Sequence, residues 1–219
     1  MIQHARPEGK NAERVVVLGA TGAVGRALVE HLEAGSVNCV PLASADIDLT
    51  LAESASRLGD LLQPEDALVF ISALTPDRGR DIRTLMKNLT MGEQVCEVLK
   101  ESSCAQVVLI SSDAVYPDGE SLIRESTPAG PDTFHGIMNL ARERMLIDTL
   151  SESDTPLLIL RPSLLYGPTD THNGYGPNRF VRLATAGDSI RLFGQGEEKR
   201  DHVFLGDVAN LIGMGLGHR

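Results

Sequence analysis

A glycine turn near the start of the chain has the spacing of a phosphate-binding loop. Four aliphatic residues, Val15 to Leu18, run into Gly19-x-x-Gly22-x-x-Gly25, and a helical pattern follows at once. Glycines permit the sharp turn and the close approach of a phosphate to backbone N–H groups, which the open helix N-terminus presents with the positive end of its dipole. The Thr21 hydroxyl also favours nucleotide binding. The pattern predicts a pyrophosphate site; the alternative is a tight strand-to-helix turn without a ligand.

A second polar stretch, Ser111-Ser112-Asp113, directly follows the apolar run Val107–Ile110. In parallel α/β sheets, ligands bind beyond the carboxyl ends of the strands, which is where these hydroxyls would stand. A serine at that edge can hydrogen-bond a carbonyl or hydroxyl of a substrate. The alternative is a strand end whose serines satisfy their own backbone.

The elements that must position these residues alternate along the chain. Strands are predicted at 15–18, 39–42, 68–71, 107–110 and 157–160, and helices at 23–33, 51–62, 82–100, 134–150 and 179–186. Aliphatic runs without alternation are typical of parallel strands buried on both faces. The order therefore predicts an α/β fold with a doubly wound parallel sheet. The run at 39–42 leaves no room for a crossover helix before Asp46–Thr50, so we expect an abbreviated strand there.

Composition narrows the class of protein. The 219 residues carry a formal charge of −10, which argues against a nucleic acid or an anionic membrane as partner. The three cysteines lack metal-ligand spacing, so we expect reduced thiols and no metal site. Residues 1–13 are polar and predict a disordered leader rather than a signal peptide, and no apolar run is long enough to span a membrane. We expect a cytoplasmic protein.

In the order of its motifs the chain resembles the extended short-chain dehydrogenase/reductase family, the NAD-dependent epimerase/dehydratase group, over nearly all of residues 14–212. The matching segments are the glycine turn, 48–50, 111–116, 160–162, 166–168, 194–196, 200–201 and 207–209. Segment 48–50 is most similar to the dTDP-4-dehydrorhamnose reductase branch, whereas Tyr116 and 166–168 look equally like the sugar-nucleotide epimerases. The resemblance implies a Rossmann-type dinucleotide-binding domain over 14–162, with a small and incomplete substrate-binding lobe over 163–219 interleaved with it.

The resemblance also implies roles for single residues. Ser112 would match the catalytic Ser/Thr. Asn178 and Arg200 would hold the diphosphate of a nucleotide sugar, although a solvated charge is the alternative for Arg200. The implied dinucleotide contacts are Gly19, Thr21, Gly22, Ala23, Val24 and Gly25 for the pyrophosphate, Asp48 and Leu49 for the adenine, and Ala73, Leu74 and Thr75 for the ribose side.

The chain departs from the family where a Tyr-x-x-x-Lys pair opens a long helix. It has His135 and Asn139 there instead, and no lysine lies between Lys100 and Lys199. Histidine titrates near neutral pH, so His135 can act as an acid/base without a lysine, while Asn139 can hydrogen-bond a ribose. The alternative is a vacated site with two ordinary polar residues.

Two functional hypotheses follow. The first is an NAD(P)-dependent epimerase, dehydratase or reductase of nucleotide sugars with an atypical active site, carried by Ser112, His135 and Asn139. The second is an inactive dinucleotide-binding protein, a sensor or assembly subunit. Asp46 lies at the distance from the glycines at which an acidic group selects NAD over NADP, although two small residues precede it. By analogy with the family, helices 82–100 and 134–150 would form a homodimer interface.

Overall fold

The sheet is parallel, as predicted. The computed structural model describes residues 12–119, 122–170, 176–192, 194–197 and 199–217, so most of the predicted leader lies outside the described residues. The five strands lie in the order β2-β1-β3-β4-β5. They are β1 (Arg14–Leu18), β2 (Cys39–Leu42), β3 (Asp66–Phe70), β4 (Gln106–Ile110) and β5 (Leu157–Leu160). Because β1 pairs with both β2 and β3, the winding of the chain reverses between β1 and β3.

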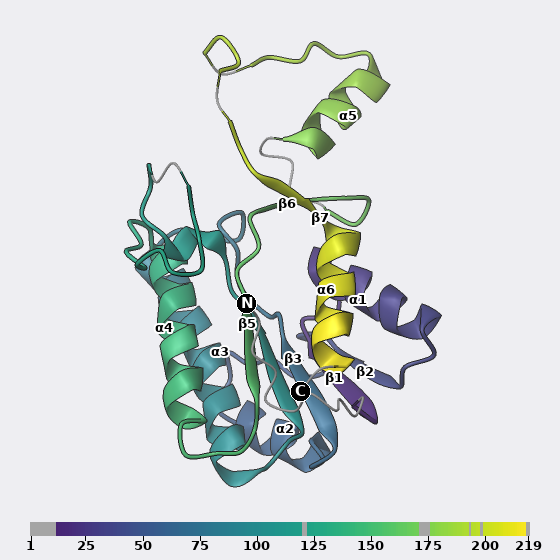
Figure 1. Cartoon of the computed structure of the whole chain (residues 1–219), viewed down its shortest axis with the longest axis vertical. Helices are drawn as coiled ribbons and strands as arrows, with labels where there is room; N and C mark the ends of the chain where they lie inside the picture. Colours follow the sequence, from purple (N-terminus) through teal and green to yellow (C-terminus); the bar gives the residue numbers. More distant parts are fainter. Residues whose placement is uncertain (1–11, 120–121, 171–175, 193, 198, 218–219) are drawn as a thin grey trace.

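Helices cover both faces of the sheet (Figure 1). Helices α1 (Ala23–Ala34) and α6 (Leu205–Gly217) pack together on one face. Helices α2 (Ser54–Leu61), α3 (Ile82–Glu101) and α4 (Phe134–Thr149) cover the other. Successive strand side chains point to opposite faces, so Val16 and Leu18 join one core and Val15 and Val17 join the other. Burial on both faces explains the unbroken aliphatic runs of the strands.

The abbreviated strand expected at Asp46–Thr50 is wrong. These residues form turns, because the Asp48 carboxylate accepts hydrogen bonds from the backbone N–H and the hydroxyl of Thr50. The side chains of Ile47 and Leu49 pack into the hydrophobic core beside α2. Helix α2 begins at Ser54 rather than at 51, and the Ser54 hydroxyl donates to the Asp48 carbonyl. Local Asx-type bonding here replaces a sheet ladder.

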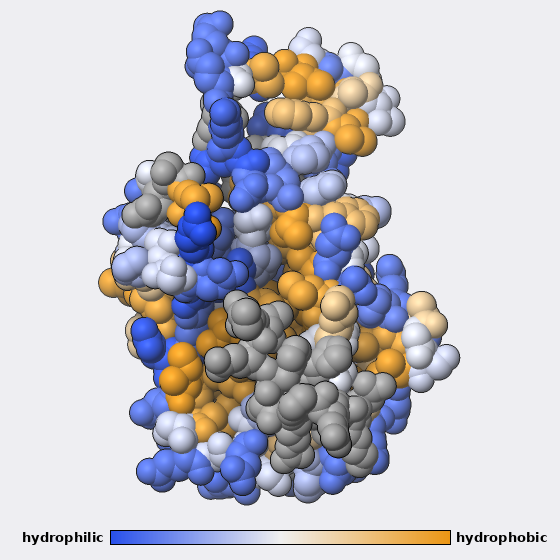
Figure 2. All heavy atoms as spheres, viewed as in Figure 1, coloured by the Kyte–Doolittle hydropathy of each residue, from blue (hydrophilic) through white to orange (hydrophobic). Residues whose placement is uncertain are grey.

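A small lobe stands above the carboxyl edge of the sheet (Figure 1). It consists of β6 (Leu164–Tyr166), α5 (Pro177–Ala186) and β7 (His202–Phe204), with β6 parallel to β7. Helix α5 starts two residues earlier than the predicted helix 179–186, with a proline in its first turn. None of its residues is buried. Apolar side chains accordingly gather on the surface of the lobe (Figure 2). Helix α6 follows β7 directly and returns to the sheet beside α1.

Candidate dinucleotide and active site

The three glycines of the turn have different surroundings. Gly19 has φ of +94°, and a Cβ there would lie 2.7 Å from the backbone nitrogen of Ser72. A Cβ on Gly25 would lie 2.2 Å from the Gly19 carbonyl oxygen, so the packing of α1 on the turn requires this glycine. Gly22 is the N-cap of α1, with φ of −70°, and its Cβ would meet only the Gly19 oxygen at 3.4 Å. No side chain caps α1, so its first N–H groups remain available to an anion.

A hollow of about 370 Å³ borders this turn and the end of β2. Its charged side chains are Arg26, Glu30 and Asp46. Arg26 donates to the Thr169 carbonyl of the lobe at 2.7 Å, and Asp46 accepts from the Ala43 N–H at 2.8 Å. The hollow lies at the carboxyl ends of β1 and β2, on the edge of a parallel α/β sheet at which ligands bind. The turn and the hollow together fit the pyrophosphate and adenosine parts of a dinucleotide.

The side chains of two predicted cofactor contacts, Asp48 and Leu49, are engaged within the protein itself. The Leu49 side chain is in the hydrophobic core, so only its backbone can face a ligand. The Asp48 carboxylate holds the Thr50 turn.

The loop Ala73–Thr75 is fixed by Asn88, whose buried amide accepts from the Leu74 N–H at 2.8 Å and donates to the Leu74 carbonyl at 3.0 Å. Sequence reasoning missed Asn88, because an amide inside a helical pattern carries no distinctive spacing.

Ser112 lies at the end of β4, as predicted, and its hydroxyl is already bonded locally. It accepts from the Ala114 N–H at 3.2 Å and donates to the Asp113 carboxylate at 3.1 Å, capping a 3-10 turn over Asp113–Val115. Burial raises the pKa of Asp113, while the bonds from Ser112 and Ala114 and the positive charge of Arg200 act against that rise. Arg200 is therefore within electrostatic reach of the serine end of β4.

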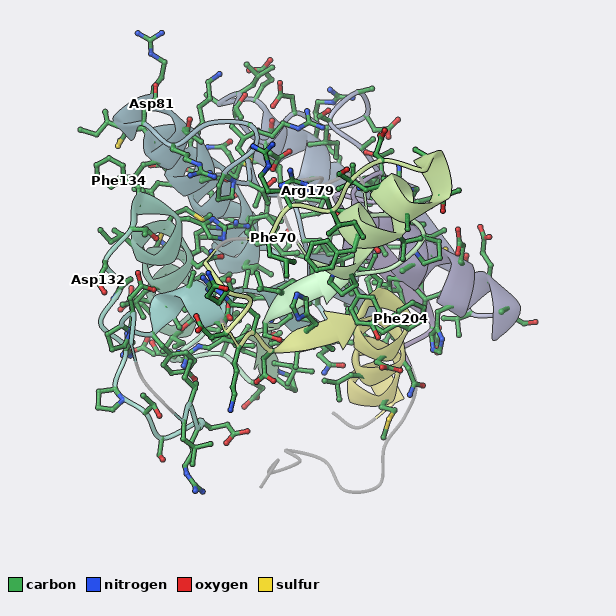
Figure 3. All side chains as sticks on the ribbon, turned by 90° about the horizontal axis from the view of Figure 1, so that it is seen from above. Phe70, Asp81, Asp132, Phe134, Arg179 and Phe204 are labelled. Atoms are coloured by element: carbon green, nitrogen blue, oxygen red, sulfur yellow. The ribbon has the colours of Figure 1, made fainter. Side chains whose placement is uncertain are left out.

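His135 and Asn139 adjoin each other on the first turns of α4. The Asn139 amide nitrogen lies 3.4 Å from His135 Nε2 and donates to the His135 carbonyl at 3.0 Å. His135 lines a cavity of about 10 Å³, the size of one water molecule, together with Leu74, Asp81 and Asn88. Figure 3 shows the starts of α3 and α4, marked by Asp81 and Phe134, side by side. Burial lowers the pKa of His135, and the charge of Arg142 lowers it further.

Helix α4 also packs closely against the turn that Ser112 caps. A Cβ on Gly136 would lie 2.0 Å from the Ala114 carbonyl, so this glycine permits the contact. Among the described residues, however, no hydrogen bond joins His135 to Ser112. The structure thus brings His135, Asn139 and Leu74 together, and it places Ser112 on the neighbouring turn without direct contact.

A buried ionic network, which sequence reasoning missed, lies beneath Ser112. Glu143 on α4 forms a bidentate pair with Arg161, with oxygen to nitrogen distances of 2.9 and 2.6 Å. Ser111 donates to the same carboxylate, and Arg161 donates to the Tyr116 hydroxyl at 2.9 Å. The bond to Glu143 raises the pKa of Arg161. The network ties β4, α4 and the segment after β5 together.

Asn178, predicted to contact a substrate, binds within the lobe. Its amide donates to the Gly167 carbonyl and the Asp170 carboxylate and accepts from the Gly167 N–H. Donation from this amide nitrogen to a substrate requires the exchange of one of these bonds. In the part of the chain that the structure describes, no three His, Cys, Asp or Glu side chains are grouped to hold a metal ion. Within the same residues, no helix combines the length and apolarity needed to cross a bilayer.

Comparisons with known proteins agree with this architecture. Residues 15–218 match the model of the NAD dependent epimerase/dehydratase family. The chain is 24% identical over 130 residues to an uncharacterized UDP-glucose epimerase, YtcB, of Bacillus subtilis, covering 59% of this chain and 41% of that protein. It is 26% identical over 184 residues to a dTDP-4-dehydrorhamnose reductase of Streptomyces griseus, covering 81% and 57%. The chain thus spans about half the length of these two relatives.

The fold is also similar to that of a solved structure. The UDP-glucose 4-epimerase of Thermus thermophilus, in its complex with NAD, superposes with a TM-score of 0.77 at 23% identity. The alignment covers 93% of this chain and 74% of that one. At this level of identity the likeness supports the fold, and the parallel sheet with its flanking helices is common to both.

Proposed function

The chain belongs to the NAD dependent epimerase/dehydratase family, and from that premise we propose that it binds a nicotinamide dinucleotide at the glycine turn and acts on a nucleotide sugar. The observation that carries the proposal is the surroundings of Gly22. Two glycines of the turn are needed by packing, whereas Gly22 leaves open space beside an uncapped helix N-terminus. That is the space that a pyrophosphate needs.

The hollow beside β2 favours NAD over NADP. It presents two carboxylates, Glu30 and Asp46, and the single guanidinium of Arg26 is engaged with the lobe. A carboxylate accepts hydrogen bonds from the ribose hydroxyls of NAD and repels the additional phosphate of NADP. The proposal therefore includes tighter binding of NAD than of NADP to the purified chain.

In the proposed reaction, the dinucleotide supplies the hydride acceptor and donor. Ser112 would hold the reacting oxygen of the sugar once its bond to Asp113 is exchanged. His135, kept neutral by burial, would take the proton from that oxygen, and Asn139 would orient the imidazole. Arg200, near the end of β4, would pair with the diphosphate of the substrate, because guanidinium groups bind phosphate in a bidentate manner. The test is turnover with a panel of UDP-, GDP- and dTDP-sugars.

The pH dependence of turnover tests the role of His135. The lowered pKa predicts that kcat/KM rises with pH, with the inflection below the usual histidine pKa of about 6.5. In His135→Gln the plateau should fall by roughly 100-fold and the inflection should disappear. An unchanged profile in that variant would remove His135 from the mechanism. The double variant His135→Tyr, Asn139→Lys restores the Tyr-x-x-x-Lys pair that the family has at these positions. Its pH profile, measured in the same assay, is the reference for comparison.

The second candidate is dinucleotide binding without turnover. It is favoured by the local bonding of the Ser112 hydroxyl and by the lack of a hydrogen bond between Ser112 and His135 in the described residues. Tight binding of NAD with no turnover on any sugar, even in the rebuilt double variant, would select this function over the first.

A homodimer through α3 and α4 is a further part of the proposal. Apolar side chains at the starts of these helices are exposed, namely Ile82, Met86, Phe134 and Ile137. Light scattering should give twice the 23.5 kDa of one chain. Met86→Glu should shift the mass to that of a monomer, because a charge would be buried between the subunits. Met214→Glu on α6 is the matched control, since Met86 and Met214 are both 56% exposed. A monomeric wild type would contradict the interface.

A further inference from the structure

Arg142 on α4 is a buried cation. Its side chain is 1% exposed, and its guanidinium carbon lies 4.0 Å from the centre of the Phe70 ring. One terminal nitrogen donates to the Ser72 carbonyl at 2.9 Å, the other lies 3.6 Å from the Met138 sulfur, and Nε has no partner. Among the described residues no carboxylate pairs with this guanidinium. Burial lowers the pKa of Arg142 to about 9, so the group remains charged at neutral pH.

Packing alone does not account for this residue. Buried arginines are ordinarily paired, and a buried charge without an ion-pair partner has lost its hydration with no ion pair to offset the cost. Apart from the Ser72 carbonyl, the side chain lies among apolar groups, which include the Phe70 ring and Met138. Moreover, α3 makes room for Arg142 with Gly92, where a Cβ would lie 3.1 Å from the arginine Cγ. The fold thus accommodates a buried charge that has no ion-pair partner among the described residues.

The charge lies close to the dinucleotide site. Ser72, whose carbonyl Arg142 binds, donates its N–H to the Leu18 carbonyl at 2.9 Å. The backbone of Ser72 also presses against Gly19, the first glycine of the turn. Phe70, under the guanidinium, ends β3 beside Leu18. The positive charge therefore lies below the carboxyl edge of the sheet. At this edge β1 leads into the glycine turn and β3 leads into the loop 73–75.

We propose that Arg142 is a positioning residue that supplies the positive charge of the dinucleotide site from beneath the loop after β3, in the absence of a lysine at position 139. The inference rests on the proposed binding of a nicotinamide dinucleotide. In this arrangement the charge attracts the dianionic pyrophosphate through the protein interior, where it is weakly screened. It also opposes protonation of His135, which lies two turns earlier on α4.

The other charged groups around His135 bear on the second effect. Arg80 and Asp81 line the same cavity as His135, from the loop before α3 and the N-cap of α3. These two groups are exposed and of opposite sign, so water screens them, and neither is a cause of the lowered pKa of His135. Arg142 is the buried charge among the three.

The test compares Arg142→Met, Arg142→Lys and a control in which an exposed charge is lost from the same helix, Arg144→Met. NAD binding is measured by calorimetry. The His135 ring protons are followed by NMR against pH without NAD. In Arg142→Met we expect about ten-fold weaker NAD binding, the effect of one unscreened charge, with an unchanged or raised Tm. The pKa of His135 should rise toward its usual value. Arg142→Lys should restore most of the affinity, and Arg144→Met should change neither quantity.

The outcomes separate this inference from the proposed function. If wild type binds NAD and Arg142→Met binds it equally well with an unmoved His135 titration, the inference is wrong and the proposed function stands. If wild type does not bind NAD, the proposed function fails and the inference fails with it. A loss of NAD affinity in Arg142→Lys as large as in Arg142→Met would show that shape rather than charge matters, which also overturns the inference.

Discussion

Gly22→Val should abolish dinucleotide binding in a chain that still folds. The φ of −70° and ψ of 172° at Gly22 are extended backbone that valine adopts readily, and the added Cβ would meet only the Gly19 oxygen at 3.4 Å. The valine methyl groups would instead occupy the space over the first N–H groups of α1. We expect NAD binding to weaken by roughly 100-fold or more, because the phosphate can no longer reach the backbone.

Two other glycine substitutions serve as controls, with calorimetry for NAD binding and circular dichroism for folding. Gly25→Ala should not fold, since its Cβ would lie 2.2 Å from the Gly19 oxygen. Gly59→Ala in α2 has no heavy atom within 4 Å of the new Cβ and should leave binding unchanged. Normal NAD affinity in a folded Gly22→Val would mean that the dinucleotide site lies elsewhere.

Glu143→Leu should cost about 3 kcal/mol of unfolding free energy, a large share of the roughly 5–15 kcal/mol typical of a domain. The substitution leaves Arg161 without its carboxylate and the Ser111 hydroxyl without its acceptor. The Arg161 side chain is 26% exposed and regains some water, so the cost stays at the lower end for a buried pair. For a chain of this length the Tm should fall by about 10 °C. Urea titration and calorimetry measure both quantities.

The double variant Glu143→Leu, Arg161→Met provides the control for this prediction. Removing both charges takes away the unpaired group, so its stability should recover most of the loss. If Glu143→Leu is as stable as wild type, the pair contributes nothing measurable. If the double variant is no better than the single one, the cost comes from packing rather than from an unpaired charge.

Much of the fold could be predicted from the sequence, because strands buried on both faces consist of unbroken runs of aliphatic residues. The five predicted strands agree with the structure to within two residues, and the glycine turn lies where β1 meets α1. The predicted helices 82–100 and 134–150 agree with α3 and α4 nearly to their ends. These elements are long or strongly periodic, so local pattern and tertiary packing agree.

The rest of the fold and of the candidate site depended on side-chain contacts that the sequence pattern does not reveal. Segment 46–50 has alternating polar and apolar residues like a strand, but Asp48 bonds to Thr50 and turns the chain. The partners of Asn88, Asn178 and Glu143 come from loops and strands that the sequence alone does not place. Arg142 appeared as one more charge in a helical pattern, and only its burial distinguishes it. The site residues predicted for the pyrophosphate, the ribose and the catalytic step stay predictions until a ligand is seen.

The most direct test of dinucleotide binding at the glycine turn is a crystal structure of the chain grown with NAD. We expect a pyrophosphate over Gly22, within hydrogen-bond distance of the first N–H groups of α1, with the adenosine in the hollow beside Asp46 and the nicotinamide toward His135. A dinucleotide bound away from the glycine turn would contradict this site. So would an NAD-free turn in crystals grown at saturating NAD, with no binding by calorimetry.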